Sequence, residues 1–142
     1  HPNYAGRPGT IGDRAGNFVA QNADLLLILG SRLNIRQVSY NWQSFAREAY
    51  KIWVDIDDLE FQKPSVKADM AVHANLKDLL PVLANQSYEG VTLEHQTWMQ
   101  WSKERMRRFP VVLPEYWENK NVNPYCFMDE LFKQLMKQGK KV

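Results

Sequence analysis

Short apolar runs alternate with helical patterns over residues 1–90. Residues 25–29 are all Leu or Ile and end at Gly30, residues 51–57 hold the apolar run Ile-Trp-Val before Asp-Ile-Asp, and a shorter run covers residues 68–73. A strand that is apolar throughout is typical of a central strand buried by helices on both faces. Strands that alternate with helices predict parallel pairing through crossover helices. We therefore predict an α/β fold with a Rossmann-like parallel sheet.

Helical patterns fill the intervals between these runs and continue beyond them. Asp13 and Asn75 are candidate N-caps, because short polar side chains cap helix N-termini. Pro81 falls inside the second of these helices, where it is expected to tighten or kink it. Pro124 stands in the first turn of the last pattern, where proline is favoured. The patterns predict helices over 14–22, 76–83, 93–108 and from 124, with an acidic helical turn over 58–62.

Three predicted strands make an incomplete parallel sheet. Their right-handed crossovers need a partner half that covers the exposed edge and completes the layers. The chain also opens with His1, within a loop, and closes on residues 139–142, where a further strand is expected to start. We therefore expect a piece of a larger enzyme, cut at both ends, that associates through its open sheet edge.

Composition narrows the classes of partner and compartment. The 18 Lys and Arg residues against 16 Asp and Glu give a net charge of +2, far from the clustered positive charge that nucleic-acid binding requires. No stretch approaches the ~20 apolar residues of a membrane span, and no signal peptide is recognisable. The single cysteine, Cys126, cannot form an internal disulfide. We expect a cytoplasmic protein that binds neither nucleic acid nor membrane.

A loop with glycines at three-residue spacing, Gly6, Gly9 and Gly12, precedes the first predicted helix. Its backbone amides can approach a phosphate at the helix N-terminus. The spacing matches neither the dinucleotide fingerprint nor a P-loop. A structural turn without a ligand therefore stays open as the alternative.

Polar side chains follow two of the predicted strands. Arg32 and Arg36 come after the strand that ends at Gly30, and Asp55 and Asp57 close the next strand. Ligands in open α/β sheets bind outside the carboxyl ends of strands, where an arginine can meet phosphate and a carboxylate can accept from a ribose hydroxyl. The alternatives are solvated loop arginines and a capping role for Asp57. If a nucleotide binds, the two strand ends form one crevice.

Other reactive side chains indicate no site. His1, His73 and His95 lack the spacing of metal ligands. Cys126 lies between aromatic residues and has the character of a buried small hydrophobe. No nucleophile elbow supports hydrolytic catalysis. We predict no catalytic residue and no metal ligand in this chain.

Five pieces occur in order: His1-Pro2, the glycine loop, Ala23 to Leu27, Gly30 to Leu33, and Val54 to Asp57. In that order they resemble the central domain of the thiamine-diphosphate enzyme family, and within it the acetolactate-synthase type. The resemblance implies that residues 1–90 are the C-terminal half of this doubly wound domain. It implies a helical linker over 91–122 and the start of the pyrophosphate-binding domain over 123–142.

The same resemblance implies the chemistry of the parent enzyme. Such enzymes use thiamine diphosphate and magnesium to decarboxylate a 2-oxo acid and transfer the acyl anion equivalent, as lyases or transferases. In the family the groups that hold this cofactor belong to the other domains, so this chain is expected to be inactive alone and to bind neither thiamine diphosphate nor magnesium. The central domain carries FAD in acetolactate synthases and ADP or nothing in relatives. The residues that match this surface are Gly9, Gly12, Gly30, Arg32, Asp55 and Asp57.

One segment departs from the acetolactate-synthase pattern. Those enzymes follow Gly-Ala/Ser-Arg with Phe-Asp-Asp-Arg, whereas residues 33–36 here are Leu-Asn-Ile-Arg, closer to other branches of the family. FAD, ADP and an empty surface therefore all stay open. The implied partners are the remaining domains of the parent enzyme and further copies of it, as a homo-oligomer. The alternative function is a stand-alone nucleotide-binding or assembly module without catalysis.

Overall fold

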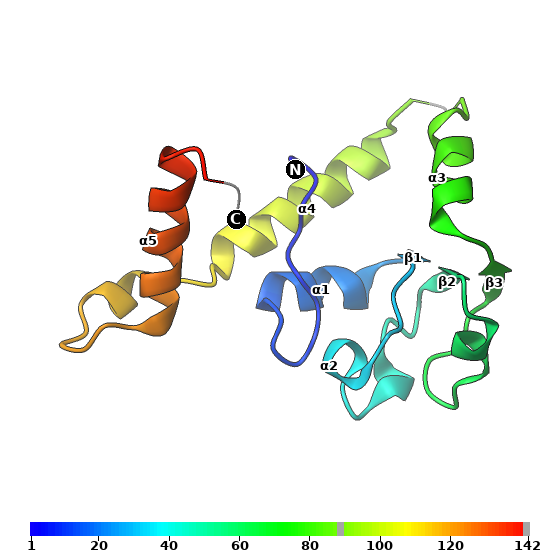
Figure 1. The fold of residues 1–142 in the computed structure, drawn as a ribbon, viewed down its shortest axis with the longest axis horizontal. Helices are drawn as coiled ribbons and strands as arrows, with labels where there is room; N and C mark the ends of the chain where they lie inside the picture. The colour runs from blue at the N-terminus through cyan, green and yellow to red at the C-terminus, as the bar shows by residue number, and fades with distance from the viewer. Residues whose placement is uncertain (88–89, 141–142) are drawn as a thin grey trace. The chain divides into compact units, whose positions relative to one another are not determined.

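The computed structural model describes residues 1–87 and 90–140, and the chain divides into two compact units, His1–Arg108 and Phe109–Val142 (Figure 1). Unit 1 holds the sheet and the helices around it. Its elements are α1 (Arg14–Asn22), β1 (Leu25–Leu29), α2 (Ile35–Val38), η1 (Trp42–Ser44), β2 (Tyr50–Asp55), η2 (Asp58–Gln62), β3 (Met70–His73), α3 (Leu76–Ala84) and α4 (Leu93–Arg108). Unit 2 holds η3 (Pro114–Trp117) and α5 (Pro124–Lys137).

The sheet of unit 1 has three parallel strands in the order β1-β2-β3. This confirms the predicted α/β class and the Rossmann-like parallel sheet. The strand ends differ from the prediction, because β2 stops at Asp55 and β3 begins only at Met70. Four elements, α1, β1, η2 and α4, have the predicted bounds. The short elements α2 and η1 were not anticipated.

The hydrophobic core of unit 1 lies against one face of the sheet. Ile28 and Trp53 are paired in register and are both buried on this face. The segments that follow β1 and β2 fold over the pair, so apolar area is removed from water on that side. They complete the core with Leu33, Val38, Phe45, Ala46, Ala49 and Val66.

The opposite face of the sheet is open. Leu25 and Leu27 of β1 are 55% and 49% exposed, and the register places them beside Tyr50 and, one strand further, Met70. The prediction that residues 25–29 form a central strand buried on both faces is therefore wrong for the described structure. The central strand is β2, because β1 pairs only with β2 among the described residues. Right-handed crossovers place their connecting segments on one face, which leaves the other without its cover.

Helix α1 packs against α4, as Figure 1 shows. Small residues, Ala15 and Ala20, are buried in α1, which permits close approach. Asp13 occupies the predicted N-cap position, but its side chain makes no capping hydrogen bond. Its Oδ2 accepts instead from the Arg7 amide at 2.8 Å. The predicted capping role was wrong because the preceding loop folds back and takes this carboxylate.

The N-cap predicted at Asn75 is confirmed, and Asn123 caps α5 in the same way. Asn75 Oδ1 accepts from the Lys77 amide, and Asn123 Oδ1 accepts from the Tyr125 amide, both at 2.9 Å.

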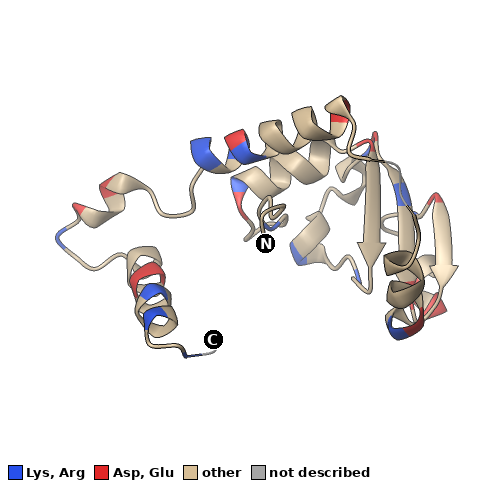
Figure 2. Cartoon of the chain, turned by 90° about the horizontal axis from the view of Figure 1, so that it is seen from above, with Lys and Arg blue, Asp and Glu red and all other residues tan. Residues whose placement is uncertain are grey.

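The strand expected over 139–142 does not begin at Gly139, because the Gly139 amide donates to the Met136 carbonyl oxygen at the end of α5. The last two residues of that prediction lie outside the described residues. Figure 2 marks both acidic and basic residues along α4 and along α5. No helix in the described part of the chain is long and apolar enough to cross a membrane.

Candidate functional site

The carboxyl ends of the three strands surround an open depression of about 470 Å³. We call it the strand-end depression. It contains four of the six residues predicted to bind a cofactor, so the expected single crevice is present. Glu60, Asn75 and Leu76 were not predicted as site residues. The lining residues are Gly30, Arg32, Asp55, Ile56, Asp57, Glu60, Ala74, Asn75 and Leu76.

Two carboxylates define the middle of this depression. Asp55, the last residue of β2, is buried, and its Oδ1 accepts from the Asp57 amide at 3.0 Å. Asp57 Oδ1 accepts from the Leu59 amide at 3.0 Å and so caps η2, which was the alternative role considered for it. Among the described residues neither Oδ2 atom has a hydrogen-bond partner. Each carboxylate therefore keeps one oxygen that can accept from a hydroxyl group.

A cluster of three charges closes one side of the depression. Glu60 has 4% of its side chain exposed, and its Oε1 accepts from Arg32 Nε at 2.9 Å. Glu60 Oε2 is in contact with the Lys63 ammonium. The hydrogen bond from Lys63 lowers the pKa of Glu60, burial opposes this, and Arg32 lowers it further. The carboxylate is therefore held charged although it is buried.

Lys63 also fixes the backbone at Arg32. Its Nζ donates to the Arg32 carbonyl oxygen at 3.0 Å, so one lysine joins η2 to the segment that follows β1. The side chain of Arg32 itself is 74% exposed. The sequence held a signal for this cluster, a Glu three residues before a Lys in an acidic turn, but only the fold brings Arg32 to it.

Gly30 and Leu76 form the floor where β1 and α3 meet. Gly30 has a φ of +56°, and a Cβ there would lie 2.9 Å from Leu76 Cδ1. A larger residue at position 30 would be strained and would displace Leu76. Asn75 lines the depression and caps α3 through its Oδ1, so its amide nitrogen has no hydrogen-bond partner among the described residues. The prediction that Gly30 lies at the site is consistent with this geometry, and its role in binding stays a prediction.

Gly9 and Gly12 do not line the strand-end depression. The side chain of Asn17 bonds both backbone groups of Gly9, with Oδ1 2.8 Å from its nitrogen and Nδ2 3.0 Å from its oxygen. A Cβ at Gly12 would lie 2.2 Å from the Arg7 carbonyl oxygen. These contacts give both glycines a structural role within the chain, and a cofactor role for them stays a prediction.

Arg36 also lies outside the depression. Its side chain is exposed, and its carbonyl oxygen accepts from the amide of Thr10 at 2.7 Å. The backbone of Arg36, rather than its guanidinium, therefore has the clear role. The alternative of a solvated loop arginine describes this side chain.

The two tryptophans of α4 form an aromatic surface outside the strand-end depression. The rings of Trp98 and Trp101 stack with centroids 5.1 Å apart and 9° between planes, and the Arg105 guanidinium lies 5.0 Å from the Trp101 centroid. Arg107 pairs with Glu104 at 2.8 Å. Arg105 and Arg107 are thus both engaged within the helix.

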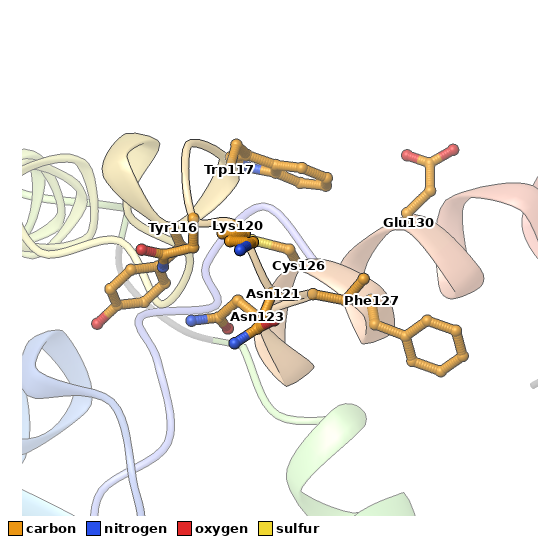
Figure 3. A pocket seen from close by; sticks show the side chains of 10 residues that line it. Tyr116, Trp117, Lys120, Asn121, Asn123, Cys126, Phe127 and Glu130 are labelled. Atoms are coloured by element: carbon orange, nitrogen blue, oxygen red, sulfur yellow. The ribbon is translucent and has the colours of Figure 1, made fainter.

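Unit 2 has a hollow of its own, of about 310 Å³. Figure 3 shows Trp117, Asn123, Cys126 and Phe127 around it. Cys126 is 4% exposed, in agreement with its expected character as a buried small hydrophobe. No residue of this hollow was predicted as a site, and nothing about it indicates a specific ligand.

Metal-binding side chains do not gather in the part of the chain that the structure describes. Magnesium needs several converging oxygen ligands. Within residues 1–87 and 90–140, no group of three or more His, Cys, Asp or Glu side chains is arranged to hold a metal ion. The strand-end depression instead offers carboxylate acceptors, an amide and one exposed guanidinium.

Known proteins resemble this chain over most of its length. Residues 1–83 match the family model described as thiamine pyrophosphate enzyme, central domain. The chain is 33% identical to the acetolactate synthase isozyme 1 large subunit of Escherichia coli K12 over 118 residues, which are 81% of the chain and 20% of that protein. It is 39% identical to the isozyme 2 large subunit of the same organism over 83 residues, 58% of the chain and 15% of that protein. A probable acetolactate synthase large subunit of Methanocaldococcus jannaschii is 27% identical over 135 residues, 95% of the chain and 22% of that protein. The chain thus spans about a fifth of the length of the curated relatives it matches.

Proposed function

The chain belongs to the thiamine pyrophosphate enzyme family, as part of its central domain, and from this premise we propose that it is a non-catalytic, nucleotide-holding segment of a 2-oxo acid decarboxylase or carboligase. Its chemistry, a lyase or transferase reaction with thiamine diphosphate and magnesium, would belong to other domains of the parent protein. The observation that carries the nucleotide role is the convergence of Gly30, Arg32, Asp55 and Asp57 on one depression at the strand ends.

The depression suits the adenosine end of FAD or ADP. Three carboxylates and one guanidinium line it, a balance that repels phosphate from its middle. Ribose hydroxyls are donors, and the Oδ2 atoms of Asp55 and Asp57 are available acceptors. The position also obeys the general rule that ligands of open α/β sheets bind outside the carboxyl ends of the strands. We therefore place the ribose beside these carboxylates.

Isothermal titration of the chain with adenosine, ADP, FAD and NAD tests this role. We expect heat from adenosine, ADP and FAD that is lost in Leu76→Trp, because the larger ring fills the depression. Leu80→Trp is the matched control, since Leu80 lies on the same helix but does not line the depression. Silence from every ligand would leave only a scaffold role for the chain.

A second assay addresses the absence of catalysis. The chain is expected to show no decarboxylation of pyruvate when thiamine diphosphate and magnesium are added, because in the family the groups that hold this pair belong to other domains. Turnover above the background of the heat-denatured chain would contradict the proposal. It would also contradict the alternative, a stand-alone nucleotide-binding module without catalysis.

A further inference from the structure

Arg32 is held at two points, and both involve the same pair of residues. Its Nε donates to Glu60 Oε1 at 2.9 Å, and its carbonyl oxygen accepts from Lys63 Nζ at 3.0 Å. Glu60 and Lys63 are themselves in contact. The backbone and the side chain of Arg32 are therefore both tied to η2, although the residue follows a different strand.

The geometry of this contact leaves the end of Arg32 available. A guanidinium is a planar fork with donors on more than one edge. Glu60 occupies the Nε position, and 74% of the Arg32 side chain remains exposed. The Nη donors have no hydrogen-bond partner among the described residues, and Arg32 lines the strand-end depression.

The charge of the cluster is not cancelled. Glu60 carries one negative charge and meets two cations, so the group of Arg32, Glu60 and Lys63 keeps a net charge of one positive unit. A simple ion pair between Arg32 and Glu60 would have neutralised both side chains. The presence of Lys63 therefore leaves Arg32 able to attract an anion.

From these contacts we infer that Glu60, supported by Lys63, is a positioning residue that presents Arg32 to the phosphate of a nucleotide bound in the strand-end depression. The inference rests on the proposed nucleotide role and assigns its two ends. The ribose lies at Asp55 and Asp57, and the phosphate lies at the rim formed by Arg32. Lys63 does not line the depression, and both carboxylate oxygens of Glu60 are already engaged by Arg32 and Lys63.

Substitution at Glu60 separates this role from a merely structural one. Glu60→Leu removes the acceptor for Arg32 Nε, and we expect it to weaken ADP binding roughly tenfold, the size expected for a lost charge-assisted contact. Adenosine binding should change little, because adenosine carries no phosphate. Glu60→Gln keeps an amide oxygen at the same place, so it should restore most of the ADP affinity.

Arg32→Lys tests the same role if the Glu60→Leu variant fails to fold. Arg32 is exposed, so the lysine variant should fold, and it keeps the positive charge but loses the fork. We expect the same selective loss of ADP binding. A lysine variant that binds ADP as tightly as the unchanged chain would overturn the inference, because charge alone would then suffice.

A measurement without ligand tests the positioning directly. NMR of the 15N-labelled chain should show that the Nε–H proton of Arg32 exchanges slowly with water. In Glu60→Leu the same proton should exchange fast. Fast exchange in the unchanged chain would contradict the inference. If adenosine and ADP both fail to bind, the proposed function fails; if both bind and Glu60→Leu weakens them equally, only the positioning role fails.

Discussion

Gly9 lies against the carbonyl oxygen of Arg36 so closely that a Cβ atom on Gly9 would be 2.4 Å from it. The φ of Gly9 is +137°, a conformation that side chains with a Cβ rarely adopt. The neighbouring Thr10 amide donates to the same oxygen at 2.7 Å. This contact attaches the glycine loop to the segment after β1, although about 26 residues of chain separate them.

Gly9→Ala is therefore expected to destabilise unit 1. The strained backbone alone costs about 1–3 kcal/mol, and displacement of the Arg36 carbonyl adds to it. Urea unfolding followed by circular dichroism measures the change. Gly90→Ala is the control, since a Cβ at Gly90 would meet nothing within 4 Å. Equal stability of the two variants would show that the loop is not anchored at Arg36.

The glycine loop also shows what the sequence could and could not predict. Three glycines before a helix predicted that backbone amides could approach a phosphate, with a structural turn as the alternative. The structure brings the carbonyl oxygens of Arg7 and Arg36 against two of these glycines, and a phosphate at the loop stays a prediction. These carbonyl partners could not be predicted, because both contacts depend on how the loop folds. The three-residue spacing of the glycines indicates that small residues are needed in this loop. Which groups they approach depends on the tertiary structure.

For the strands, too, one property could be predicted from the sequence and another could not. Apolar runs correctly placed β1, β2 and β3, because burial on a sheet is a local property of the sequence. The order of the strands is a long-range property, and an apolar run cannot distinguish a central strand from an edge strand whose outer face is open. Arg32 and Asp57 were predicted at one crevice through a general rule of α/β sheets. Glu60 was missed because its partner Arg32 is 28 residues away.

Acidification is expected to weaken the cluster at η2. The pKa of Glu60 in the folded chain lies below its ordinary value of 4.5, chiefly because Lys63 donates to it. A carboxyl with a lowered pKa stabilises the fold above its ordinary value, and this contribution is lost as the pH falls from 4.5 toward the folded pKa. The difference in unfolding free energy between the unchanged chain and Glu60→Gln should therefore shrink below pH 4.5.

Denaturant unfolding at a series of pH values measures that difference. Glu48→Gln is a suitable control, because the Glu48 side chain is 81% exposed and its pairing with Arg47 is screened by water. Its curve should run parallel to that of the unchanged chain. A constant gap between Glu60→Gln and the unchanged chain across the acid range would exclude the buried pair as the cause.

Trp53 is expected to contribute more through its volume than through its indole nitrogen. The residue is 0% exposed, and its ring meets Phe61 edge to face with centroids 5.8 Å apart. Its Nε1 has no hydrogen-bond partner among the described residues. Trp53→Ala should cost about 3–5 kcal/mol of unfolding free energy through the cavity it leaves, whereas Trp53→Phe loses no hydrogen bond and should cost clearly less.

Calorimetric or urea unfolding of the two variants checks this order. Trp117→Ala, which removes a side chain that is 53% exposed in unit 2, should change the stability of unit 1 by less than about 0.5 kcal/mol. Equal costs for Trp53→Ala and Trp53→Phe would show that the indole nitrogen has a partner after all.

The open sheet face predicts self-association of the chain. Leu25, Leu27, Tyr50 and Met70 share this face, each about half exposed, and none carries a charge that would oppose contact between copies. Exposed apolar faces beside an open sheet edge favour association. Light scattering should give a mean mass that rises with concentration, and Leu27→Lys should return it toward one chain, because burying an ammonium in such a contact is costly. Met128→Lys, on an exposed residue of α5, should leave the association unchanged. A mass of one chain at every concentration would show that this face remains in water without a partner.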